Sequence, residues 1–117
     1  MNKGFQNIAI LCTAVFLSSC ASMYLKDGKQ AYEQLEYDKA IFNLEKGLVK
    51  KEDSEAQIAL ANSYMKVNRF DKATSWYETA SLGPNLTDED RLDYGRALMS
   101  SGRYEQAEDV FEADATR

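Results

Sequence analysis

The most informative absence in this 117-residue chain is histidine, which does not occur at all. Histidine is the commonest general acid–base in enzymes and the commonest metal ligand, so its absence gives little support for either kind of site. The chain also has no glycine-rich phosphate-binding loop. A serine nucleophile would need lysine or a carboxylate as its activating partner, and no serine is marked out by its neighbours. We therefore expect no catalytic residue, no metal site and no small-molecule cofactor.

Basic residues are outnumbered by acidic ones, and proline and glycine are few. The chain has 14 lysines and arginines against 19 acidic residues, which gives a net charge of −5. This balance argues against nucleic acid as a partner, because nucleic acid requires a basic face. One proline and six glycines indicate a regular, ordered chain rather than a flexible one.

No apolar run is long enough to cross a membrane. The longest, Ile8 to Leu17, has ten residues, about half of the roughly 20 that a spanning helix needs. Lys3 is the only charged residue before Cys20, and the run ends in the small residues Ser18 and Ser19. A positive start, a short apolar core and a small-residue exit indicate a secretory signal peptide over residues 1–19.

The four residues at this exit, Leu17-Ser18-Ser19-Cys20, resemble the lipobox of bacterial lipoproteins. The resemblance implies that Cys20 becomes a lipidated N-terminus, with residues 20–25 as a short tether. Ala21 stands where aspartate would signal retention in the inner membrane. The resemblance therefore favours a lipid anchor at the periplasmic face of the outer membrane. Two alternatives remain open, a buried N-terminal helix with a core cysteine and ordinary signal cleavage without lipid.

If residues 1–19 are a signal peptide and Cys20 carries lipid, neither cysteine is available as a free thiol. Cys12 lies within the signal peptide and would be removed, and the sulfur of Cys20 would be blocked by lipid. No disulfide or redox site is then possible. Removing residues 1–19 would leave 98 residues with 13 basic against 19 acidic side chains, which is enough chain for one small domain.

The remaining chain contains a threefold repeat. The matching segments are YDKAIFNLEKGL from Tyr37, FDKATSWYETAS from Phe70 and YEQAEDVFEADA from Tyr104. Their starts are 33 and then 34 residues apart, and each opens with an aromatic and an acidic residue. Each is preceded by a second segment, and both kinds have apolar residues three and four places apart, which is helical spacing. The sequence therefore predicts three pairs of helices in an all-α chain.

The repeat resembles the tetratricopeptide repeat, a helical hairpin of 34 residues. The small positions of the motif fall on Gly28, Ala61 and Gly95 in the first helices, on Ala40, Ala73 and Ala107 in the second helices, and on Gly47 and Ala80 near their ends. The large residue of the second helix is Leu44, Tyr77 and Phe111. The resemblance implies a right-handed superhelix of about three hairpins over residues 26–115, with units at about 24–53, 54–86 and 87–117.

Two details concern the ends of the helices. Ser54 with Gln57, and Thr87 with Asp90, resemble capping boxes. In the third unit Asp114 replaces the last small residue, and the rest of that helix is polar. It is either a solvated cap that closes the stack or a truncated unit, and the sequence leaves both possibilities open.

In this family the first helices build a concave face that often receives an extended peptide. Lys29, Asn62 and Arg96 occupy the same inward position in the three units. One turn further on, the predicted face also contains Tyr32, Met65, Lys66 and Met99. Amide, cationic and soft apolar groups together suit a peptide. The alternative is that Lys29 and Arg96 are merely solvated and that the methionines belong to the core. Trp76 is interpreted as packing between units.

The sequence supports three hypotheses. The first is a non-enzymatic scaffold, anchored through lipid on Cys20, whose concave face binds a protein or peptide partner. The second is the N-terminal region of a larger lipoprotein, since the lipobox followed at once by such hairpins is similar to OmpA-type and secretion-associated or gliding-machinery lipoproteins of Bacteroidota. The third is an enzyme or an accessory subunit of one. Fold alone names no partner, because this repeat serves many functions.

Overall fold

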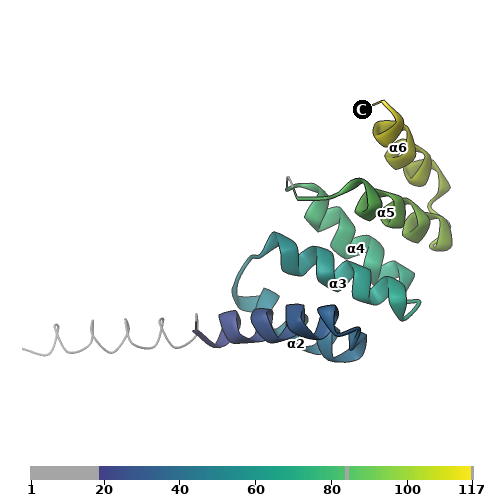
Figure 1. Ribbon diagram of the computed structural model, residues 1–117. Helices are drawn as coiled ribbons and strands as arrows, with labels where there is room; N and C mark the ends of the chain where they lie inside the picture. The colour runs from purple at the N-terminus through teal and green to yellow at the C-terminus, as the bar shows by residue number, and fades with distance from the viewer. Residues whose placement is uncertain (1–18, 84, 117) are drawn as a thin grey trace, which may run out of the picture.

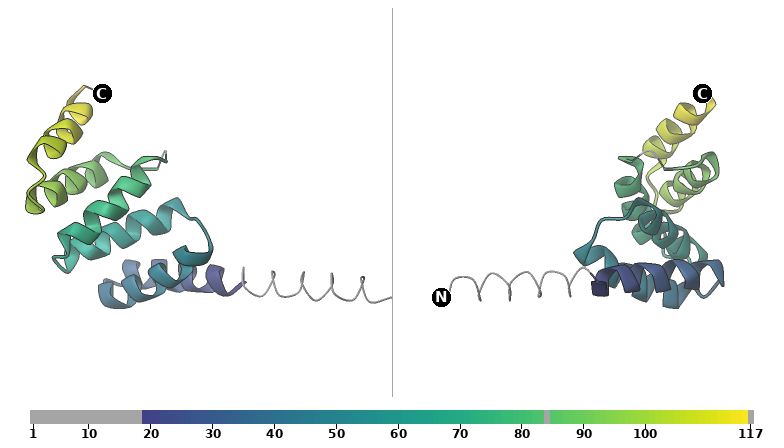
Figure 2. Two further views of the ribbon diagram at one scale, coloured as in Figure 1. Left: turned by 180° about the vertical axis from the view of Figure 1, so that it is seen from behind. Right: turned by 60° about the vertical axis from the view of Figure 1, so that its left-hand side comes forward.

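The protein forms a stack of helices. The computed structural model describes residues 19–83 and 85–116. Residues 19–33 are helical, and five helices follow: α2 (Tyr37–Lys50), α3 (Ser54–Lys66), α4 (Phe70–Ser81), α5 (Asp88–Ser100) and α6 (Tyr104–Ala115). The described residues contain no strand. Figures 1 and 2 show each helix running beside the next, with α2 and α6 at opposite ends of the stack. The predicted all-α helical repeat is confirmed, and the predicted signal peptide lies almost wholly outside the described residues.

Small residues hold the two helices of a pair close together. A Cβ added at Gly28 would lie 2.6 Å from Cγ of Leu44, and one added at Gly47 would lie 2.5 Å from Cδ2 of Leu25. A Cβ added at Gly95 would meet the ring of Phe111 on α6. Helix axes can approach to about 8 Å only where such side chains are absent. These three glycines therefore fix the pairing of the helices, as the repeat pattern predicts.

The core follows the large-residue position of the repeat, but not equally in the three units. Leu44 and Tyr77 are fully buried, whereas Phe111 is half-buried. The Tyr77 ring packs against Tyr94 of α5, with centroids 5.6 Å apart. Trp76 is half-buried against the core, in agreement with its predicted packing role. The core is thus densest in the first two units and thins toward α6.

The first helix of each pair ends in a left-handed turn at the same repeat position. Leu35, Asn68 and Gly102 all have positive φ, at 63°, 60° and 76°. The residue that follows each of them donates its N–H to a carbonyl inside the preceding helix, over 2.8–2.9 Å. This is the C-terminal cap that favours glycine. The third unit has glycine at this position and the second has asparagine, which also tolerates it, so only Leu35 in the first unit is strained there.

The helix starts confirm one predicted cap and correct another. Thr87 and Asp90 form the predicted capping box at α5, with Thr87 Oγ1 accepting from the Asp90 N–H over 3.1 Å. At α3 the cap is Asp53, whose carboxylate accepts from the Ala56 N–H over 2.9 Å. Ser54 already lies inside the helix. The prediction was wrong by one residue because Asp and Ser are equally good caps and stand next to each other.

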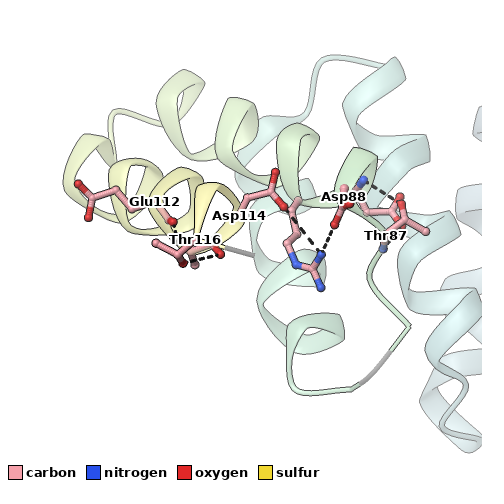
Figure 3. Close-up of polar contacts among 8 residues, drawn as sticks. Thr87, Asp88, Glu112, Asp114 and Thr116 are labelled. Carbon is pink, nitrogen blue, oxygen red and sulfur yellow. Dashed lines mark hydrogen bonds and ion pairs between the residues drawn. The ribbon is translucent and has the colours of Figure 1, made fainter.

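In the third unit an ion pair takes the place of the last small residue of the repeat. The Arg91 guanidinium on α5 lies 2.7 Å from Asp88 and 4.0 Å from Asp114 of α6. Figure 3 shows Asp88 and Asp114 directed toward this guanidinium from the two helices. Thr116 closes α6 by donating its hydroxyl to the carbonyl oxygens of Glu112 and Ala113. The departure of Asp114 from the repeat pattern therefore has a structural counterpart on α5.

The tether expected over residues 20–25 has a regular structure. These residues belong to the helix that runs through residues 19–33. Ala21 and Leu25 are buried, and Leu25 packs on Gly47 of α2. Cys20 is exposed at the start of the described chain. The first helix of the hairpin thus includes Cys20, because its apolar residues Ala21 and Leu25 continue the helical spacing back to that point.

Candidate functional site

The first helices of the three pairs line one face of the stack. α3 contacts α5 directly, and the 19–33 helix lies on the other side of α3. This face contains two adjoining hollows of about 460 and 280 Å³. Both are lined by Tyr32, Asn62 and Asp90. We call these two hollows together the concave groove.

Asn62 is the centre of the groove, and its amide bonds inward. Its Nδ2 donates to the Tyr32 hydroxyl oxygen over 3.2 Å and to Asp90 Oδ1 over 3.3 Å. Its Oδ1 accepts a hydrogen bond from the hydroxyl of Tyr77. Both ends of the amide are therefore engaged by three other helices. Asn62 ties the three units together, which differs from its predicted role as a binder of a partner's backbone.

The groove concentrates negative charge around this network. Burial, together with the charges of Asp93 and Asp90, raises the pKa of the Tyr77 hydroxyl far above its ordinary value. Asp90 is itself buried and accepts at Oδ2 from the N–H and the hydroxyl of Thr87, over 3.0 and 2.8 Å. Glu89 and Asp93 line the smaller hollow beside it.

Lys29 forms an ion pair across the first two units. Its Nζ lies 2.8 Å from Asp53 and 3.5 Å from Glu55. Partial burial alone would lower the pKa of Lys29, but the hydrogen bond and charge of Asp53, with the charge of Glu55, raise it above its ordinary value. Burial alone would likewise raise the pKa of Asp53, but the bonds from Lys29 and the Ala56 N–H lower it. The charge of Lys29 is therefore largely satisfied within the protein.

The seven residues predicted for the concave face divide into two groups. Lys29, Tyr32, Asn62, Met65 and Lys66 line the groove. Arg96 and Met99 line neither of its hollows. Arg96 pairs with Asp93 on its own helix over 3.1 Å. Met99 borders a separate apolar hollow of about 450 Å³ against α6, with Tyr104 and Phe111.

Acidic groove residues were missing from the prediction. The carboxylates that line the groove are Glu33, Glu55, Glu89, Asp90 and Asp93, and its lining cations are Lys29 and Lys66. A signal for part of this set was present in the sequence. Glu89 and Asp93 are four residues apart, and Asp93 stands three residues before Arg96, so the three share a helix face. Asp90 is less visible, because an acid at a helix start is expected for capping alone.

Other kinds of site have little support in the described residues. No group of three or more His, Cys, Asp or Glu side chains among them is arranged to hold a metal ion. Within residues 19–83 and 85–116, no helix has the length and apolar character needed to cross a bilayer. A further hollow of about 600 Å³ lies beside the 19–33 helix and is lined mainly by polar side chains, Lys26, Gln30 and Lys51 among them.

Comparison with known proteins agrees with the repeat architecture. No curated protein matches the chain. Among solved structures, the TPR domain of Arabidopsis OM64 is similar, with a TM-score of 0.69 and 18% sequence identity over 86% of this chain and 84% of that one. At this identity the likeness shows the fold alone.

A family model identifies the repeat from the sequence. The model is described as "Anaphase-promoting complex, cyclosome, subunit 3", and it matches residues 33–114. Repeats of this tetratricopeptide type are typically non-enzymatic scaffolds for protein–protein interaction. Since the match spans most of the sequence and the helices stack as this repeat requires, the chain belongs to that family of tetratricopeptide-type repeat proteins.

Proposed function

We propose that this protein is a membrane-anchored adaptor whose concave groove binds an extended, positively charged segment of a protein partner. The lipobox-like residues Leu17 to Cys20, with Ala21 after them, support a lipid anchor at the periplasmic face of the outer membrane. The groove supports the binding function. It needs no cofactor and no catalytic group.

The observation that carries this proposal is the composition of the smaller hollow. It is lined by Glu89, Asp90 and Asp93, by one cation, Lys66, and by Tyr32, Asn62 and Met65. Asp93 is also paired with Arg96 outside the hollow, which leaves the acids in excess by one. A lysine or arginine side chain fits such a site, because its stem packs on ring and thioether surface while its charge meets carboxylates.

The ion pairs that Lys29 and Arg96 form within the protein also favour a basic partner segment. Lys29 and Arg96, the cations predicted to hold a partner carboxylate, are paired with Asp53 and Asp93. Binding a carboxylate there would require breaking those pairs. Glu33 and Glu89 have exposed carboxylates on the rim of the groove. Complementary charge therefore favours a basic segment over an acidic one.

The test is a selection of short random peptides against the purified, lipid-processed full chain. The selected peptides should be rich in lysine and arginine, and their affinity should fall as salt is raised. The double variant Glu33→Lys, Glu89→Lys should weaken their binding by at least about tenfold, because it reverses two charges on the rim. Circular dichroism would confirm that the variant is folded.

A matched control makes the same charge change away from the groove. Glu105→Lys with Asp109→Lys reverses two exposed acids on α6 that line neither groove hollow. We expect this variant to bind the selected peptides as the wild type does. Peptides without a basic preference, or equal losses in both double variants, would contradict the assignment of the groove.

A further inference from the structure

One side of α2, which faces away from the core, exposes large apolar side chains. Phe42 is 57% exposed and Val49 is 77% exposed. They are seven residues apart, so they lie on the same side of the helix, two turns from each other. The buried residues of α2, Ala40, Leu44 and Gly47, occupy the opposite side. This side of α2 therefore exposes two large apolar side chains that the hairpin does not need for its core, together with the exposed acid Asp38.

Lysines flank the apolar pair. Lys46, one turn from Phe42, has its Nζ 4.3 Å from the centroid of the Phe42 ring and 5.4 Å from that of Tyr24. Lys50, one turn further along the same flank, is exposed. Lys39 also lies on this side but pairs with Glu36 over 2.9 Å. We call Phe42, Lys46, Val49 and Lys50 the outer face of α2.

Apolar side chains beside lysines are the pattern of a helix that lies in a membrane interface. The rings and branched chains enter the headgroup boundary, and the ammonium groups remain level with the lipid phosphates. Each lysine near an anionic surface strengthens such binding about fivefold.

The net charge of the stack also differs between its two ends. Residues 20–51, which form the first pair, contain six lysines and five acidic residues. Residues 85–116 contain nine acidic residues and three arginines. Figure 1 shows these two pairs at opposite ends of the stack. An anionic surface therefore repels the α6 end, with six excess negative charges, far more than the nearly neutral α2 end.

The outer face also lies at the end where the lipid would be attached. The first helix and α2 are antiparallel, so the end of α2 lies beside the start of the 19–33 helix. Lys51 Nζ donates to Ser22 Oγ over 3.3 Å, and Gly47 packs on Leu25. Val49 and Lys50 are therefore neighbours of the segment that begins at Cys20.

We propose that the outer face of α2 rests on the anionic bilayer surface and orients the stack with its acidic end away from the membrane. This inference rests on the membrane anchoring proposed above. It adds a second contact to the lipid, made by Phe42 and Val49 in the interface and by Lys46 and Lys50 on lipid phosphates.

The experiment compares how deeply two labelled positions of the protein enter the bilayer. An environment-sensitive dye is attached at Val49→Cys or at Leu82→Cys in the lipid-processed chain, which has lost Cys12 with the signal peptide and whose Cys20 sulfur is blocked. Leu82 is a suitable control because it is 91% exposed and lies at the end of α4, in the second pair. The chain is reconstituted in vesicles of phosphatidylethanolamine and phosphatidylglycerol, with and without doxyl-labelled lipids.

The dye at position 49 should shift its emission to the blue and be quenched by doxyl lipids at least about twofold more than the dye at position 82, since the interface buries about 5–10 Å of such a face. The quenching at 49 should disappear in the double variant Lys46→Glu, Lys50→Glu. Equal, solvent-like emission at both positions would overturn the proposal. So would quenching at 49 that is the same in uncharged phosphatidylcholine vesicles.

Two further measurements separate this proposal from its alternatives. The mass of the purified chain shows whether Cys20 carries lipid, and a Cys20→Ala chain added to the same vesicles tests the outer face without that lipid. Absence of lipid with quenching retained at 49 would reject the anchor and keep the outer face. A blue shift at 49 that grows with protein concentration, without quenching by doxyl lipids, would mean that a second copy covers the face, and would overturn the proposal.

Discussion

The first and third units are built from the same repeat, yet they close the two ends of the stack in opposite ways. In the first unit Gly28 and Gly47 bring the helices together over a fully buried Leu44. In the third, Phe111 is half-buried, and an ion pair from Arg91 to Asp114 replaces the last small contact. The comparison shows that the repeat positions define the hairpin, while the depth of its packing depends on what lies beyond it.

The largest expected effect compares the two large residues of the repeat. Leu44→Ala removes a fully buried side chain and should lower the free energy of unfolding by about 3–4 kcal/mol. Phe111→Ala removes a half-buried ring and should lower it by about 1–2 kcal/mol, because less apolar surface is lost. Urea unfolding followed by circular dichroism measures both. Equal losses would mean that the third unit is packed as deeply as the first.

The next comparison concerns Gly28 and Gly95, the glycines at which the two helices of the first and third pairs cross. Gly28→Ala should destabilise by about 2 kcal/mol, because the new Cβ meets Leu44 at 2.6 Å and its backbone N at 3.0 Å. Gly95→Ala should cost less than about 1 kcal/mol. The three atoms nearest its Cβ all belong to the half-buried Phe111 ring, which can move outward, and alanine also favours the helix. A greater loss for Gly95→Ala would show that Phe111 is held more firmly than its exposure indicates.

The first and third units also differ in how they join the middle unit. The junction with the first unit contains the ion pair between Lys29 and Asp53, so its contribution to stability should depend on pH. The pKa of Asp53 is lowered in the folded protein, so its bonds stabilise the fold above its ordinary pKa. This stabilisation is lost as pH falls through the lowered value. Asp53→Asn keeps an acceptor for the Ala56 N–H but removes the charge, and should cost about 1 kcal/mol at pH 7. The deficit should vanish in acid, as measured by unfolding between neutral pH and pH values below about 3.

Thr87→Ala is the control at the other junction. It removes the α5 cap and should cost about 1 kcal/mol. Because Asp53 is intact in this variant, we expect the part of the acid dependence that comes from Asp53 to be retained. An Asp53→Asn deficit that persists unchanged in acid would assign the lost stability to packing and not to charge.

The smallest expected effects lie in the left-handed turns. Leu35→Gly in the first unit should stabilise by about 0.5–1 kcal/mol, since Leu35 is exposed and has φ of 63°. Gly102→Ala in the third should destabilise by about 1 kcal/mol, although its Cβ would touch nothing, because φ is 76° there. Thermal unfolding resolves both changes. If neither changes the melting temperature, the turns are free to adopt another conformation.

The sequence predicts the fold far better than the groove. Gly28, Gly47 and Gly95 are visible because they recur at fixed spacing and their contacts lie within one hairpin. The bonds of Asn62 are not visible in the same way, since Tyr32, Tyr77 and Asp90 come from three other helices. Met99 was placed on the concave face by its register, but α6 lies against it there. Residues shared between hairpins depend on how the hairpins stack, and the repeat pattern does not specify this.

The Asn62 network has a consequence for how long the groove stays assembled. Asp90, Glu89 and Asp93 belong to the third unit, the least deeply packed one, and in a stacked repeat the terminal unit opens most easily. Each fraying of α5 and α6 therefore takes away the acidic wall of the groove and leaves the Asn62 amide and the Tyr77 hydroxyl to water. A bound segment that spans α3 and α5 closes this opening, so amide hydrogen exchange in α6 should slow on binding although α6 touches no part of the ligand.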